Sequence, residues 1–224
     1  MRRVAPGVTA VVLVGLTGLT GCGSDAGAAT QTGFSTPSAA ADVPAKATVS
    51  SLAGLAVIPG GFLKSSSSDP RQLTGPFTRQ TFVSNLSGSP AQDHALLLNA
   101  GCNEGYQTFR LSPDRRKRVT VQLFKTASKA KALDLQKSFW KQDEHSLKFA
   151  VPGVPEALTD ARTEVDGVTG QLEAVAAASI TVGTFVAEIT IRQTGTLEKT
   201  PAPDIKLATT ILKLQKTRLL TKSG

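Results

Sequence analysis

An alternating pattern on either side of a turn constrains the fold of this chain most. Residues Gly105–Leu111 alternate loosely between apolar and polar types, and Arg118–Phe124 alternate until their last residue. Ser112–Asp114 begins a turn between the two segments. A period of two bounded by turn residues is typical of β-strands that pair as a hairpin. The sequence therefore predicts an antiparallel hairpin near the middle of the chain.

A helix is expected directly after this hairpin. Within Ser128–Lys141, the apolar residues Ala132, Leu135 and Phe139 recur at the spacing of one helix face. Lysines occupy much of the remaining surface of this segment. The pattern predicts an amphipathic helix that packs its apolar face against the hairpin.

Two further helices are predicted before the hairpin. Pro90–Ala100 has Ser89 as a candidate cap, a proline in its first position and Gly101 just past its end. Phe77–Leu86 is a shorter candidate, with Thr78 as its cap.

The second half of the chain follows the same order of elements. Gly170–Ala178 and Thr184–Arg192 read as strands around a turn, and a helix is expected from Ile205 to about Leu219 after the cap Asp204. Strand–strand–helix thus occurs twice, as a candidate repeat of element order. These elements predict an α+β fold, in which one antiparallel sheet has helices packed on it.

The start of the chain joins two basic residues to an apolar run. Arg2 and Arg3 precede Val8–Leu19, which contains no charge. A transmembrane helix needs about 20 apolar residues, so this run is too short to span a bilayer. A cleaved export signal is therefore the better interpretation.

The apolar run leads into Leu19-Thr20-Gly21-Cys22, which resembles the lipobox of bacterial lipoproteins. The resemblance implies that residues 1–21 are a signal peptide and that Cys22, lipidated on sulfur, begins the mature chain. It also implies a location on the extracytoplasmic face of the cell membrane, held there by lipid. The alternative is an ordinary secretory signal that is followed by an incidental cysteine.

Composition separates a tether from a folded domain. Residues 22–47 are rich in Gly, Ala, Ser, Thr and Pro and cannot bury enough apolar surface to order themselves. We expect them to form a flexible tether to a single α+β domain over residues 48–224, a length that suffices for one core. Aromatic residues are only 5% of the chain, so an aliphatic core is expected.

The second cysteine, Cys102, has no partner within the chain if Cys22 carries lipid. No internal disulfide is then expected. No histidine or lysine lies next to Cys102 to lower its pKa, so a buried, inert thiol is favoured. The alternative is a reactive thiol or an intermolecular disulfide.

A dense basic cluster falls at the predicted hairpin turn. Its members are Arg115, Arg116, Lys117 and Arg118, with Lys129 and Lys131 following in the next helix. Four cations projecting from a turn would suit anionic lipid headgroups or cell-wall polymers, at about 1 kcal/mol each near a charged surface. An envelope protein is the other partner considered, whereas the implied compartment argues against nucleic acid. The alternative is a solvated turn.

Catalytic and metal-binding patterns are absent from the sequence. Ser128–Lys131 and Ser138–Lys141 match the Ser-x-x-Lys spacing of penicillin-recognising enzymes, but the accompanying Ser-Asp-Asn and Lys-Thr-Gly elements do not occur. The two histidines, His94 and His145, form no zinc motif. We therefore expect no catalytic residue, no metal and no cofactor.

Three short segments carry a wider resemblance: Ile58–Phe62, Gly75–Phe77 and Gly105–Phe109. With the lipobox, they make the chain similar to secreted actinobacterial lipoproteins of unknown function, over most of residues 50–224. The layered arrangement also looks like the two-layer sandwiches of PsbP-like domains. Both resemblances imply a fold and a compartment, and neither supplies catalytic residues.

Three functions remain open at this point. A non-enzymatic binding or interaction module at the membrane agrees with the anchor, the tether and the basic excess. A carrier would hold a lipid or small apolar ligand in a pocket between sheet and helices. An enzyme assembled from distant residues would have a cleft containing carboxylates of perturbed pKa.

Overall fold

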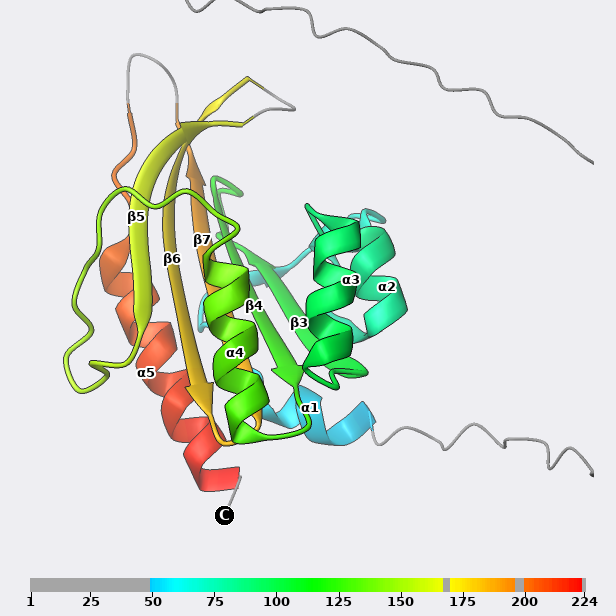
Figure 1. Cartoon of the computed structure of the whole chain (residues 1–224). Helices are drawn as coiled ribbons and strands as arrows, with labels where there is room; N and C mark the ends of the chain where they lie inside the picture. Colours follow the sequence, from blue (N-terminus) through cyan, green and yellow to red (C-terminus); the bar gives the residue numbers. More distant parts are fainter. Residues whose placement is uncertain (1–48, 167–169, 196–199, 223–224) are drawn as a thin grey trace, which may run out of the picture. The chain divides into compact units, whose positions relative to one another are not determined.

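A seven-stranded antiparallel sheet forms the centre of the fold (Figure 1). The strands are β1 (Leu63–Lys64), β2 (Gly75–Thr78), β3 (Glu104–Leu111), β4 (Lys117–Lys125), β5 (Leu158–Val165), β6 (Leu172–Val182) and β7 (Phe185–Thr194). Their order is β1-β3-β4-β7-β6-β5, and β2 also pairs with β3. Helices pack on this sheet, which confirms the predicted α+β fold.

The computed structural model describes residues 49–166, 170–195 and 200–222. These residues belong to one compact unit that begins at Lys46. The predicted signal peptide, the lipidated Cys22 and the tether lie outside the described residues. None of the helices in the described ranges is long and apolar enough to cross a membrane.

Two hairpins build most of the sheet. β3 and β4 form the predicted one, with Thr108 opposite Val121 and Arg110 opposite Val119. β6 and β7 form the second around Gly183, whose φ of 58° lies in the left-handed region that glycine adopts without strain. β4 and β7 pair with each other, so the two hairpins join into one continuous sheet.

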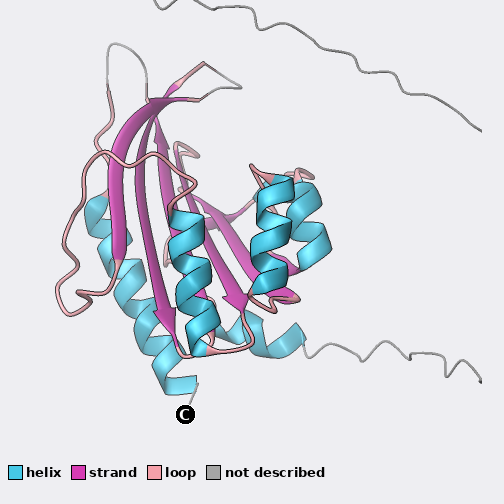
Figure 2. Cartoon of the chain, in the orientation of Figure 1, coloured by secondary structure: helices cyan, strands magenta, loops and turns pink. Residues whose placement is uncertain are grey.

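Helices cover both faces of this sheet (Figure 2). They are α1 (Val49–Leu55), α2 (Arg79–Asn85), α3 (Pro90–Asn99), α4 (Lys129–Trp140) and α5 (Ile205–Lys222), with a 3-10 turn, η1 (Pro70–Gln72). α1 and α5 pack on one face, and α2, α3 and α4 pack on the other. The fold therefore has three layers, and the expected likeness to a two-layer sandwich is wrong.

The order strand–strand–helix does recur, as β3-β4-α4 and β6-β7-α5. The two helices nevertheless lie on opposite faces of the sheet, because α4 belongs to one hydrophobic cluster and α5 to the other. β5 precedes the second hairpin and was not predicted. The part of the chain after α4 therefore contributes three strands, and the part before it contributes the β3–β4 hairpin and the short strands β1 and β2.

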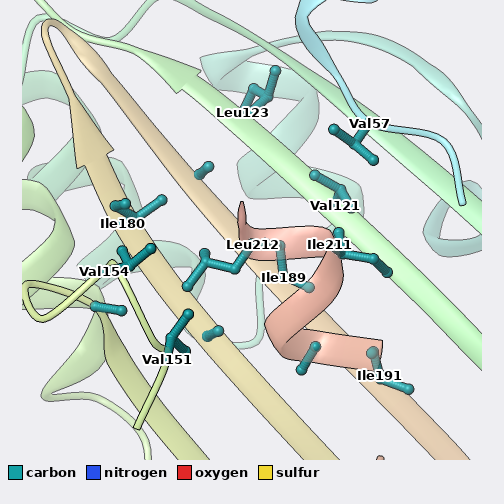
Figure 3. Packing of buried hydrophobic residues seen from close by; sticks show 14 of the residues in the cluster. Val57, Val121, Leu123, Val151, Val154, Ile180, Ile189, Ile191, Ile211 and Leu212 are labelled. Carbon is teal, nitrogen blue, oxygen red and sulfur yellow. The ribbon is translucent and has the colours of Figure 1, made fainter. Parts of the chain in front are cut away.

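The larger hydrophobic cluster lies between the sheet and α5 (Figure 3). Its central side chains are at most 1% exposed: Val121, Leu123, Ile180, Ile189, Ile191, Ile211 and Leu212. Burying an aliphatic side chain of this size stabilises a fold by about 1.5–3 kcal/mol. This cluster is aliphatic, as the composition predicted.

The smaller cluster, on the opposite face, is aromatic. It is built around Phe77, Phe82, Phe124 and Phe139, whose ring centroids lie 5.1–6.3 Å apart. Gly105 lies directly beneath these rings, and a Cβ at this position would come within 2.2 Å of the Phe77 ring. The close approach of β3 to the aromatic cluster therefore requires glycine.

The predicted helix Phe77–Leu86 begins two residues later than expected. Gly75–Thr78 is strand β2, and α2 starts at Arg79 because Thr78 caps it. The Thr78 hydroxyl accepts from the backbone N–H of Thr81 at 3.2 Å. Ser89 occupies the cap position of α3 but forms no side-chain capping bond there.

Candidate functional site

The face that carries α4 is apolar at one end and polar at the other. Phe124 of β4 and Val186 of β7 pack under the helices. Alternate strand residues share a face, so Gln122, Thr120 and Arg118 continue the Phe124 row beyond the helices. Polar side chains thus occupy the part of this face that is not buried in the aromatic cluster.

A pocket of about 660 Å³ lies over this polar region. Gln107, Phe109 and Thr120 line it from β3 and β4, and Gln72 and Leu86 line it from the segments before β3. The charged lining residues are Asp69, Arg71, Arg118, Glu164, Asp166 and Arg192. The arginines and carboxylates of the lining balance in formal charge.

Ion pairs join the strands beneath the pocket. Arg118 of β4 pairs with Glu173 of β6. Arg192 of β7 lies between two carboxylates, 3.1 Å from Glu173 and 2.5 Å from Glu164. Arg162 of β5 donates to the second oxygen of Glu164 at 2.7 Å. Every guanidinium of this network is thereby held by a carboxylate from another position in the sheet.

The network ends at Asp160, which is fully buried. Its carboxylate accepts from Arg162 at 2.6 Å and from the backbone N–H of Ser146 at 2.7 Å. Burial alone would raise the pKa of Asp160, but these hydrogen bonds outweigh it and hold the pKa below its usual value. The same balance lowers the pKa of Glu164, through Arg162 and Arg192. These carboxylates are therefore ionised at neutral pH.

Amide side chains fix the opposite wall of the pocket. The Gln107 amide donates to the carbonyls of Arg71 and Leu73, at 3.1 and 2.9 Å, which ties the segment around η1 to β3. Gln122 donates to the Gln107 side-chain oxygen at 2.8 Å. Arg118 Nε is buried and has no hydrogen-bond partner within the described residues. Arg118 and Gln122, which both line the pocket, therefore bring hydrogen-bond donors to this wall.

A second pocket of about 150 Å³ adjoins the first, since Gln122 lines both. Glu188, Asp93 and Asp143 are among its lining residues. Burial raises the pKa of Glu188 to about 7, and the nearby charges of Asp143 and Asp93 act in the same direction. A hydrogen bond of 3.2 Å from the Ser179 hydroxyl opposes this shift. Glu188 is therefore a carboxyl group that titrates near neutral pH.

The predicted basic cluster divides between two environments. Arg115, with φ of 59°, and Arg116 are exposed in the turn between β3 and β4. Lys117 belongs to β4 and pairs with Asp204 at 2.5 Å, while Arg118 contributes to the pocket. The expectation that all four cations project from a turn is therefore wrong for Lys117 and Arg118.

Lys129 and Lys131 do not extend this cluster. They lie in the first turn of α4, which follows the far end of β4 (Figure 1). A nine-residue strand is roughly 25–30 Å long, so β4 separates them from Arg115 and Arg116 by about that distance. Lys131 donates to the Asn99 side chain at 2.9 Å, and Lys129 is exposed.

Cys102 is buried and free, which agrees with the inert thiol that the sequence favoured. Burial raises its pKa to about 11, and a hydrogen bond to the carbonyl of Glu104 offsets this only in part. A thiol in this state carries almost no reactive thiolate at neutral pH.

Ser128 and His145, two other residues considered in the sequence, have structural roles. Ser128 caps α4 by accepting from the backbone N–H of Lys131 at 3.2 Å. The His145 ring stacks on Trp140, with centroids 4.2 Å apart. Within the described part of the chain, no group of three or more His, Cys, Asp or Glu side chains is arranged to hold a metal ion.

Sequence reasoning missed most of the pocket. Arg192, Glu173 and Glu164 were not recognised, and β5 was not identified as a strand. One signal was present: Asp160, Arg162 and Glu164 alternate with other residues, which places three charges on one face of a strand. Charged alternation of this kind is easily taken for a solvated loop, because the sequence does not show that these charges pair with one another and with Arg192 of β7.

No family model matches this chain, and no curated protein matches it. Among solved structures, it is similar to the extracellular domain of PknH from Mycobacterium tuberculosis. The two share 12% sequence identity, and the match covers 78% of this chain and 97% of that domain with a TM-score of 0.40.

Proposed function

We propose that this chain is a membrane-anchored extracytoplasmic module that binds a small polar ligand in the pocket over β3, β4 and β7. The observation that carries the proposal is the pocket of about 660 Å³ above the ion-pair network. Three of its charged lining residues, Arg118, Arg192 and Glu164, are positioned by ion-pair partners on other strands, which is how rigid binding sites are built. The anchor is the lipid expected on Cys22.

The chemistry of the lining favours a polar ligand of low net charge. Arginines, carboxylates, amides and Thr120 offer both donors and acceptors, and the formal charges of the lining cancel. A ligand with many hydrogen-bonding groups would satisfy such a lining, whereas an apolar one would leave it unpaired. The polar lining therefore favours this ligand over the lipid expected for a carrier.

The experiment compares two tryptophan substitutions in chains isolated from a bacterial envelope. Thr120→Trp places a large side chain on the pocket floor, and Thr163→Trp is its control on an exposed position of β5 outside the lining. Native mass spectrometry should show an added mass on the parent and on Thr163→Trp that Thr120→Trp lacks. A bare mass for all three, or equal retention by Thr120→Trp, would overturn the proposal.

Glu188 favours a second candidate, an enzyme that uses acid–base chemistry. A carboxyl group with a pKa of about 7, in a pocket that adjoins the first, matches the requirements of a general acid or base. Glu188→Gln preserves the shape of the side chain and removes its proton transfer. If the parent converts the extracted ligand to a product and the variant binds the ligand without converting it, the chain is an enzyme and not a binding module.

A further inference from the structure

All the charged residues of α5 are basic. The helix contains five basic residues and no acidic residue in 18 positions. Its inner side packs in the larger hydrophobic cluster. We call the exposed side the α5 outer face, and its residues are Lys206, Thr210, Lys213, Leu214, Thr217, Arg218, Leu220 and Thr221.

Aliphatic side chains accompany these cations. Leu214 and Leu220 are 54% and 57% exposed, and Ile58, from the segment after α1, is 51% exposed. Ile58 and Leu214 line a groove of about 350 Å³ together with Thr217 and Arg218. A surface that combines exposed aliphatic residues with lysines gains from both apolar burial and attraction to anionic lipids when it lies on a membrane.

Two polar side chains of α5 hold the beginning of the folded domain against this helix. Gln215 donates to the carbonyl of Leu55 at 2.8 Å and accepts from the N–H of Val57 at 2.9 Å. Arg218 donates to the carbonyl of Ala56 at 2.7 Å. The end of α1 and the segment that follows it therefore lie beside the C-terminal half of α5.

We propose that the α5 outer face, with Ile58, is the surface by which this domain rests on an anionic lipid bilayer. The proposal rests on the anchoring at Cys22 given under the proposed function. Lysines would contact phosphate headgroups, and Leu214, Leu220 and Ile58 would enter the boundary between headgroups and acyl chains. The pocket lies on the opposite face of the sheet from α5, so it stays open to the ligand in this orientation.

This surface suits a membrane better than the turn between β3 and β4. The turn presents Arg115 and Arg116 without an exposed aliphatic neighbour in it, and Asp114 lies beside them. The outer face combines cations with apolar groups. Lys216, at its border, is already paired with Glu156 at 2.7 Å, and Arg218 donates to the carbonyl of Ala56 at 2.7 Å. Lys206 and Lys213 are therefore the cations assigned to the membrane.

The test uses the chain from Gly23 to Gly224, which lacks the lipid but keeps the compact unit. Sedimentation with vesicles of phosphatidylcholine and phosphatidylglycerol measures partitioning at low salt. At low salt, the double variant Lys206→Gln with Lys213→Gln should lower partitioning by roughly tenfold or more. At high salt, where charges are screened, the double variant Ile58→Ser with Leu214→Ser should lower the partitioning that the parent retains. Arg115→Gln with Arg116→Gln, which removes the same charge, is the matched control and should change it much less.

Equal losses in the two charge pairs would show attraction by net charge alone and would overturn the assignment of α5. No sedimentation of the parent would also overturn it. Membrane fractionation of the full chain and its Cys22→Ala variant tests the anchor separately. If the full chain is anchored but its lipid-free form does not bind vesicles, the α5 surface is contradicted and the proposed function is unaffected.

Discussion

The ionisation of Glu188 makes the stability of the fold depend on pH. Its pKa of about 7 in the folded chain exceeds the ordinary value of 4.5, so the folded state holds a proton that the unfolded state has lost between these values. Stability from this group is therefore greatest below about pH 4.5 and falls as pH rises to about 7. At about 1.4 kcal/mol per pKa unit, the decline is on the order of 3 kcal/mol.

Glu188→Gln should remove this decline, because glutamine keeps the acceptor for Ser179 and carries no charge. We expect the variant to exceed the parent in free energy of unfolding at pH 8 and to match it near pH 4. Urea unfolding at both pH values measures the difference. Asp160 and Glu164 have lowered pKa values, so both proteins lose stability in acid. This loss is the same in the parent and the variant and cancels from their difference. A difference independent of pH would contradict the assignment.

Glu173 should matter more to stability than an exposed carboxylate does. It is 2% exposed and pairs with both Arg118 and Arg192. Glu173→Ala would leave two partly exposed guanidinium groups without this partner, so the cost should lie between about 1 kcal/mol, as for an exposed pair, and about 3–5 kcal/mol, as for a fully buried one. Glu104→Ala, in the exposed pair with Lys125, is the control and should cost at most about 1 kcal/mol. Similar losses in denaturant unfolding would show that the network is not a buried one.

At the scale of elements, Gly105 shows how tightly β3 approaches the aromatic cluster. Gly105→Ala should lower the free energy of unfolding by about 1–3 kcal/mol, because the new methyl group overlaps the Phe77 ring. Gly75→Ala on β2, where a Cβ meets nothing within 4 Å, should change it little. Urea denaturation of the two variants checks this, and equal effects would contradict the packing described for Phe77.

Elements with strong local periodicity were predictable from the sequence. The β3–β4 hairpin, α3, α4, α5 and the β6–β7 pair follow from alternation, caps and helix spacing. Asp204 does cap α5, by accepting from the N–H of Leu207 at 2.9 Å. β5 was missed because one of its faces carries Asp160, Arg162 and Glu164 in place of apolar residues. These charges pair with one another and with Arg192 of β7.

The candidate site was hardly predictable, for a related reason. Arg118 was identified within a basic run, yet its environment depends on Glu173, which lies 55 positions later in the chain. Runs of like charge suggest one surface, whereas alternation along β4 sends Lys117 and Arg118 to opposite faces of the sheet. Only the pairing of β4, β7, β6 and β5 brings Arg118, Arg192 and their carboxylate partners together.

At the scale of the whole molecule, the anchor sets where the pocket and α5 act. Cys22→Ala should shift the chain from the membrane fraction to the soluble fraction, or leave it with an uncleaved signal, because the sulfur that carries lipid is gone. Cys102→Ala is the control and should remain in the membrane fraction, since its thiol is buried. Metabolic labelling with a radioactive fatty acid measures both, and normal labelling of Cys22→Ala would contradict the anchor.

The most direct test of the central claim is an experimental structure of the chain isolated from a bacterial envelope with its added mass retained. The account predicts density for a polar molecule in the pocket, in contact with the side chains of Arg118 and Gln122. Density for that molecule at another surface, with only solvent between Arg118 and Gln122, would contradict it.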